Sequence, residues 1–263
     1  MNKNAYTSIR LVKGEVNLYD FGEVKLHAYK TNDPIRDEVF ILEKAGKAVV
    51  IESPCFADNI QELTEYLKDM EVAGMLVAYH GAGASFLPDV PKYATANAVE
   101  YSANGGGKAL VEGFAQAFGS AFDRSIHKVT QVIGEGPVTI GGMEFVIRQT
   151  AEAFDMELSE INAVYTHMLG HDCHSIVGGA AHADAMIAQL RGYIAKGYSL
   201  ILTSHYTPED LKDAQTKIDY LETLKEIAAG CASREAFEAA VQARYPDYSG
   251  GNYLEMTAGF FFA

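Results

Sequence analysis

The chain has 263 residues, of which 48% are hydrophobic, and this is enough to build a sizeable buried core. Its 35 acidic residues outnumber its 21 Lys and Arg residues, giving a formal net charge of −14 at pH 7. A surface of this sign repels phosphate backbones and argues against nucleic acid as a partner, and the absence of an apolar run near ~20 residues argues against a membrane span.

The first part of the chain is predicted to form strands. Residues Val24–Tyr29 alternate between apolar and polar, and Glu38–Glu43 carries a run of apolar side chains. Gly46-Lys47 predicts a hairpin turn into the apolar strand Ala48–Glu52. This part of the chain therefore begins with paired strands.

A helix and a buried strand are expected next. Asp58 is placed to cap a helix whose apolar residues recur at helical spacing. The run Gly74–Tyr79 then predicts a buried strand that ends at His80. A loop of small residues, Gly81–Ser85, follows this histidine.

The middle of the chain alternates between helices and strands. A helix is predicted from about Lys108 to Phe122, strands within Val129–Thr150, and another strand at Ile161–Thr166. A further helix, His182–Ala195, leads to the strand Tyr198–Ser204. Strands interleaved with helices indicate an α/β protein in which helices cover the faces of the sheets.

The C-terminal part is predicted to be helical over about residues 208–245. Thr207-Pro208-Glu209-Asp210 favours a helix start, with a hydroxyl at the N-cap, Pro at the first position and acids in the first turn. The apolar tail that ends in Phe260-Phe261-Phe262 is expected to dock on the body or on a second subunit. Since no linker is rich in Pro or Ser, residues 1–263 are interpreted as one domain.

Histidines mark the ends of three predicted buried strands. They are His80, His167 and His205. Ligands gather at the carboxyl ends of strands in α/β sheets, where neutral imidazoles can converge on a metal. Three imidazoles and a water would make an open catalytic zinc site and lower the pKa of that water to about 7. The alternative is that single histidines are core residues with ordinary hydrogen bonds.

The other histidines carry weaker signals. His171 and His174 flank Asp172 in one tight turn, so not all of these side chains can point into a site. Asp172 or His171 is a candidate catalytic base or a supporting partner of a metal ligand. Nothing in the pattern points to His27 or His127, which we interpret as core residues.

A family resemblance covers roughly Val16 to Leu211. The order of the segments "KAVVIESP", "GMLVAYHG", "NAVYTHMLGHD" and "LILTSHYTPED" resembles that of the metallo-β-lactamase superfamily. Members of that superfamily show an early strand ending in an acid, an HxHxDH motif, a metal-bridging Asp after a strand and a final His. The resemblance implies a four-layer αββα sandwich.

The HxHxDH motif is degenerate in this chain. His80 matches its first His, whereas Ala82, Ala84 and Ser85 stand at the following ligand positions. The segment 148–155, where the family's next His would fall, contains none. The resemblance therefore does not imply the family's usual binuclear site.

The later positions of the pattern are only partly altered. His205 matches the terminal His, and His167 falls where the bridging Asp is usual, although a shifted alignment places Asp172 there. Glu52 replaces the Asp that ends the early strand and supports the site. The resemblance leaves a site of His80, His167 and His205.

Two functions are compatible with this pattern. The first is a divergent mononuclear hydrolase of an ester, thioester or amide, with Asp172 in a catalytic role. Its metal ligands would be His80, His167 and His205, holding one divalent ion, with zinc favoured over iron or manganese. The second is a non-catalytic protein that binds a small molecule or a partner on the same fold around a vestigial metal site.

The setting of the protein is also predicted. Three widely spaced cysteines without a CxxC pair, and a polar N-terminus, favour a soluble cytoplasmic protein. The apolar tail predicts a homodimer. A small-molecule substrate or ligand is the expected partner.

Overall fold

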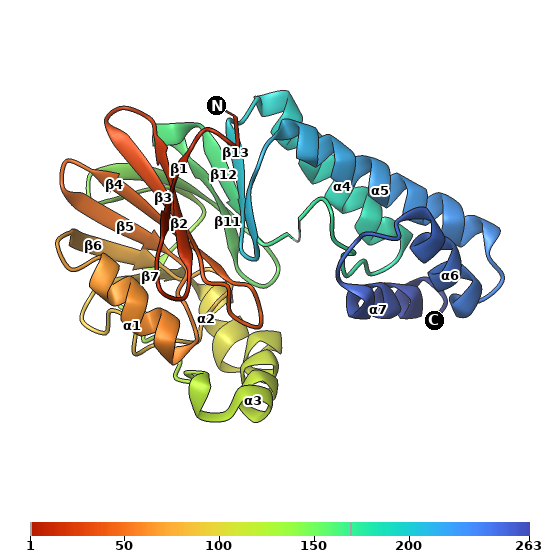
Figure 1. Ribbon diagram of the computed structural model, residues 1–263, viewed down its shortest axis with the longest axis horizontal. Coiled ribbons are helices and arrows are strands. Elements are labelled where there is room, and N and C mark those ends of the chain that lie inside the picture. Colours follow the sequence, from red (N-terminus) through yellow and green to blue (C-terminus); the bar gives the residue numbers. More distant parts are fainter. Residues whose placement is uncertain (1, 169) are drawn as a thin grey trace.

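The computed structural model describes residues 2–168 and 170–263. Two β-sheets stack face to face, with helices on their outer faces, as Figure 1 shows. The helical C-terminal part extends away from the sheets beside the second sheet (Figure 1). This layering confirms the predicted α/β sandwich.

The first sheet has eight strands in the order of the sequence. They are β1 (Thr7–Arg10), β2 (Glu15–Asp20), β3 (Val24–Lys30), β4 (Glu38–Lys44), β5 (Lys47–Ile51), β6 (Glu71–Leu76), β7 (Lys92–Thr95) and β8 (Gln131–Ile133). Strands β1 to β5 pair antiparallel, and β5 to β8 pair parallel. The predicted hairpin turn lies between β4 and β5, where Ala45 and Gly46 both have positive φ, as a tight primed turn requires.

The second sheet has six strands. Its order is β14 (Tyr206–Glu209), β13 (Leu200–Thr203), β12 (Ala163–Thr166), β11 (Phe154–Leu158), β10 (Met143–Gln149) and β9 (Gly136–Ile140). Only β12 and β13 pair parallel. Those two strands both run toward the edge of the sheet where His167 and His205 lie.

The core between the sheets draws on both halves of the chain. Phe40 and Leu42 of β4 contribute from the first sheet, and Phe145 and Tyr165 from the second, all fully buried. The rings of Phe40 and Tyr165 meet edge to face, with centroids 6.1 Å apart. This shared apolar layer fixes the relative position of the two sheets.

Helices cover both outer faces. Helix α1 (Ala57–Tyr66) packs its Ile60 and Leu63 on the first sheet. Helices α2 (Ala96–Ala103) and α3 (Gly106–Phe118) connect β7 to β8. Helices α4 (Ala180–Lys196) and α5 (Leu211–Gly230) cover the second sheet. The four layers are therefore α, β, β and α.

The start of the C-terminal helical part differs from the prediction. Tyr206–Glu209 forms the edge strand β14, and α5 begins only at Leu211, with Asp210 as its N-cap. Helices α6 (Arg234–Arg244) and α7 (Gly251–Phe261) follow. None of the helices in the described residues is both long and apolar enough to cross a membrane.

The apolar tail is expected to dock on the body of the protein or on a second subunit, and in the structure it packs on the body. The rings of Phe261 and Phe262 pack on Phe237 of α6, with centroids 5.5 Å and 5.6 Å apart. Thr257 of α7 accepts a hydrogen bond from the Val177 backbone and donates one to the Ser175 carbonyl. Helix α7 thereby fastens the loop that precedes α4.

Candidate metal centre

Three histidines converge at one edge of the sandwich. His80 lies just beyond β6 of the first sheet, whereas His167 and His205 follow β12 and β13 of the second. One ligand atom from each lies within 4.8 Å of the other two. The ring centroids are 5.1 Å to 5.5 Å apart. The structure thus brings together the three histidines that the sequence predicted, and their geometry fits a shared ion.

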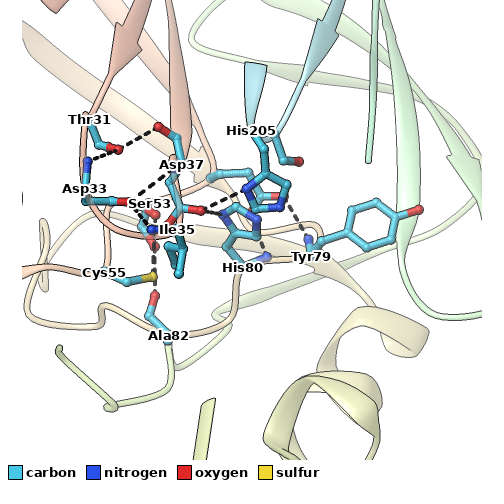
Figure 2. Close-up of polar contacts among 12 residues, drawn as sticks. Thr31, Asp33, Ile35, Asp37, Ser53, Cys55, Tyr79, His80, Ala82 and His205 are labelled. Atoms are coloured by element: carbon cyan, nitrogen blue, oxygen red, sulfur yellow. Dashed lines mark hydrogen bonds and ion pairs between the residues drawn. The ribbon is translucent and has the colours of Figure 1, made fainter. Parts of the chain in front are cut away.

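A carboxylate that the sequence pattern did not predict lies beside these histidines. Asp37, in the loop between β3 and β4, is 1% exposed, and its Oδ1 lies 3.3 Å from Nδ1 of His205 and 3.8 Å from Nδ1 of His80. Figure 2 shows both rings turned toward this carboxylate. Both oxygens of Asp37 and both of these nitrogens are buried without a hydrogen bond to any described residue.

The unpaired atoms of Asp37, His80 and His205 indicate whether the site can hold a cation. Buried polar atoms in folded proteins nearly always have a partner, so Oδ1 of Asp37 and the two unpaired nitrogens near it call for an explanation. A bound cation would satisfy a carboxylate and neutral imidazoles together. The residues present therefore fit a divalent metal ion.

Glu52 holds the backbone that carries His80. Its φ of +64° is a strained conformation for a residue other than glycine, and its side chain is completely buried. The carboxylate accepts hydrogen bonds from the backbone N–H of Tyr79 (2.8 Å) and His80 (3.0 Å) and from the Tyr165 hydroxyl (2.6 Å). The position inferred to support the site therefore does so.

The same acidic surroundings act on the His80 ring. Burial works to lower the pKa of His80, but the carboxylates of Asp37, Glu52 and Asp33 outweigh burial and raise it. A site with this much negative charge attracts cations, whether the cation is a proton or a metal ion.

His167 is oriented by two contacts. Its Nδ1 is hydrogen-bonded to Ser204 Oγ at 2.8 Å, and its ring stacks on Tyr79 with centroids 4.6 Å apart. The residue is exposed, yet protein atoms crowd its ring. Loss of solvation, and then the nearby His205 and His80, lower the pKa of His167 well below its usual value. Because Nδ1 is engaged, Nε2 is the nitrogen of His167 that remains for a metal.

The small-residue loop after His80 cannot supply further ligands. Ala82 is buried and pairs with Ile126, and Ala84 donates its backbone N–H to Ser125. Ser85 is tied through both its N–H and its hydroxyl to Asp123. The side chains at positions 82, 84 and 85 therefore add no ligand to the histidine cluster.

A cleft adjoins the histidine cluster. Its volume is about 560 Å³, and it is lined by Lys3, Asn4, Lys30, Asn32, Asp33, Arg36, His171, Asp172, His205, Thr207, Pro208 and Glu209. His205 belongs to both the cluster and the cleft. A small molecule in the cleft would lie next to the histidine cluster.

Asp172 and His171 lie in this cleft, outside the cluster. Asp172 is exposed. His171 is held through its Nδ1 by Glu209 at 2.8 Å, with Asp213 3.6 Å from its Nε2. The hydrogen bond to Glu209 raises the pKa of His171 despite partial burial. The catalytic role of Asp172 stays a prediction.

The histidines interpreted as core residues have ordinary partners. His27 is hydrogen-bonded to Tyr66 and Glu43, and His127 to Ser53. His174, in the turn with Asp172, is buried and hydrogen-bonded to Tyr220. These three rings lie outside the converging triad, although Nδ1 of His127 and Nε2 of His174 are also buried without a hydrogen bond to any described residue.

Comparison with solved structures identifies the architecture as the metallo-β-lactamase fold. A metallo-β-lactamase from Erythrobacter litoralis superposes with a TM-score of 0.57 at 14% identity, over 82% of this chain and 100% of its own. A metallo-β-lactamase from Pontibacter korlensis gives 0.54 at 13% identity, over 79% and 99%.

A third similar structure is larger. The inverting sec-alkylsulfatase Pisa1 from Pseudomonas sp. superposes with a TM-score of 0.64 at 13% identity, over 92% of this chain and 49% of its own length. This chain therefore spans about half of that enzyme. No protein-family model and no curated protein sequence matches the chain.

Proposed function

We propose that this chain is a mononuclear metal-dependent hydrolase that acts on an ester, thioester or amide. The observation that carries the proposal is the convergence of His80, His167 and His205 within 4.8 Å beside a cleft of about 560 Å³. The structures that share the fold include β-lactamases and a sulfatase, all hydrolases by name.

The residues of the site would divide the work. His80, His167 and His205 would hold one divalent ion, zinc being favoured over iron or manganese because imidazole donors dominate. Such an ion supplies Lewis acidity toward a carbonyl and lowers the pKa of water. The cleft would place the substrate next to His205, and Asp172 on its wall is the proposed proton acceptor.

The first test is the metal content of untagged protein purified without chelator. We expect near-stoichiometric zinc, iron or manganese in the wild-type protein, and its loss in the His80→Ala, His205→Ala double variant. His182→Ala is the matched control, because His182 is exposed at the start of α4 and outside the cluster. Wild-type protein that neither carries nor takes up metal at micromolar concentration would contradict the proposal.

Activity is the second test. Metal-loaded protein is assayed against model acyl esters, thioesters and amides, with Asp172→Asn beside the wild-type protein. We expect metal-dependent hydrolysis that falls in the Asp172 variant by about 10²–10⁴-fold, the contribution typical of a general base. Unchanged activity in Asp172→Asn would remove Asp172 from the mechanism.

A non-catalytic role is the second candidate function. It is favoured by Ala82, Ala84 and Ser85, which occupy the usual ligand positions and are engaged in the packing and hydrogen bonds of their own loop. Under this alternative the cleft binds a small ligand and metal binding is weak or absent. Metal-dependent hydrolysis that disappears in His80→Ala would exclude it.

A further inference from the structure

The spacing of Asp37 from the two imidazoles is unlike that of a hydrogen bond. A charge-assisted N–H···O bond is about 2.7–2.9 Å long. Nδ1 of His205 and Nδ1 of His80 are instead 3.3 Å and 3.8 Å from Asp37. One oxygen, Oδ1, faces both nitrogens. A carboxylate that oriented the two rings by accepting hydrogen bonds from their N–H groups would lie closer to each nitrogen.

The 3.3 Å distance to His205 matches that between two atoms that share an ion, and the 3.8 Å distance to His80 is about 0.2 Å longer than the range for such atoms. Two donors at tetrahedral positions, each about 2.0–2.2 Å from a zinc ion, are about 3.3–3.6 Å from each other. Imidazole rings that point at one ion in this way have centroids about 5 Å apart. The observed centroid distances of 5.1 Å, 5.3 Å and 5.5 Å agree with this arrangement.

The charges around Asp37 also favour a cation at this position. The Asp37 side chain is 1% exposed and lacks a hydrogen-bond donor among the described residues, and an unpaired buried carboxylate is costly. Asp33, in the same loop, is also buried, and its carboxylate accepts a hydrogen bond from the Asp37 backbone N–H. Glu52 lies on the other side of His80. Acidic groups thus surround the imidazoles, and the ion-pair partners of Asp37 in the described residues are the two histidines and no Lys or Arg.

We propose that Asp37 is a direct ligand of the metal ion and completes a set of three imidazoles and one carboxylate. This inference rests on the metal site of the proposed function. The loop between β3 and β4 would then supply the carboxylate that the later part of the chain lacks, since His167 stands where the resemblance places a bridging Asp. A single divalent ion of the zinc type is the cofactor that this donor set takes.

The test compares Asp37→Asn with the wild-type protein, using Co²⁺ as a spectroscopic probe. Glu38→Gln is the matched control, because Glu38 is the next residue, is equally buried and has Lys30 and Glu15 as its charged neighbours instead of the imidazoles. Co²⁺ absorption in the visible reports the number and type of ligands, and chelator competition gives the affinity for Zn²⁺.

We expect Asp37→Asn to change the Co²⁺ spectrum and to weaken Zn²⁺ binding by more than about 100-fold, while Glu38→Gln changes neither. Loss of a group that only orients a ligand typically costs about 10–100-fold. An unchanged spectrum in Asp37→Asn, even with weaker binding, would overturn the proposal.

Crystals of wild-type protein loaded with zinc test the inference without a variant, which covers the case in which Asp37→Asn does not fold. We expect an Asp37 oxygen about 2.0–2.2 Å from the anomalous peak. An oxygen more than about 3.5 Å from the ion overturns the inference and leaves the hydrolase proposal standing. A zinc-bound Asp37 in a protein without hydrolytic activity would support Asp37 as a ligand and contradict the hydrolase proposal. Protein that binds no metal would contradict both proposals.

Discussion

His127 is a buried histidine outside the metal cluster, and its surroundings predict how stability depends on pH. Its ring is hydrogen-bonded to Ser53, and burial followed by the nearby Lys92 lowers its pKa to about 4. The unfolded chain binds a proton below about pH 6.5, whereas the folded protein binds it only below about pH 4. Stability contributed by the neutral ring is therefore complete above about pH 6.5 and decreases as the pH falls toward 4.

We expect the loss from this one group to reach about 3 kcal/mol across that range. The free energy of unfolding, measured in urea at several pH values, should fall more steeply in the wild-type protein than in His127→Gln, whose amide does not titrate. Parallel pH profiles of the two proteins would show that His127 is not the group responsible.

At this scale, the sequence predicted the histidines of the site better than its acids. His80, His167 and His205 could be predicted because each follows an apolar run that ends abruptly, which marks the end of a buried strand. Asp37 has no such signal, since an acid in a polar loop is ordinary. Its place beside His205 depends on two sheets stacking, which no local pattern in the sequence encodes.

At the scale of elements, Asp210 decides where the longest helix begins. Its side chain accepts hydrogen bonds from the backbone N–H groups of Lys212 (2.9 Å) and Asp213 (3.2 Å). The Asp213 side chain in turn accepts a hydrogen bond from the Asp210 backbone N–H, which completes a capping box. We expect Asp210→Ala to lower the free energy of unfolding by about 1 kcal/mol. Urea denaturation measures the loss.

Asp219→Ala on the same helix is the control for this prediction. Asp219 is exposed, and among the described contacts its side chain accepts a hydrogen bond only from the Gln215 side chain. Its replacement should change stability by no more than about 0.5 kcal/mol. Equal losses of unfolding free energy in Asp210→Ala and Asp219→Ala would mean that the N-cap does not specifically stabilise the helix.

The sequence placed this helix start too early for a physical reason. Thr207 and Pro208 have the chemistry of an N-cap and a first helical residue, but they lie in β14. That strand is at the edge of its sheet, where a proline without an N–H is tolerated. Pairing with β13 therefore outweighs the local helix signal of Thr207 and Pro208. Asp210 is the N-cap of α5.

At the scale of the whole molecule, the site lies where the two sheets meet. His80 and Asp37 come from the first sheet, and His167 and His205 from the second. Much of the order of strands and helices could be predicted from the sequence because apolar runs alternate with amphipathic segments, whereas β14 is predicted as helix. The convergence of the two sheet edges follows instead from the shared core, in which residues far apart in sequence, such as Phe40 and Tyr165, are in contact.

A metal ion at this position should stabilise the entire fold, because its ligands join both sheets and exist together only in the native state. Zinc at about 100 times its dissociation constant should raise the free energy of unfolding by about 2.7 kcal/mol. The protein has 15 Tyr and no Trp, so tyrosine fluorescence and circular dichroism follow unfolding in urea. Both signals should shift together in the wild-type protein, and neither should shift in His167→Ala. A zinc-dependent shift that survives in His167→Ala would place the binding elsewhere, since it would no longer require the ligand from the second sheet.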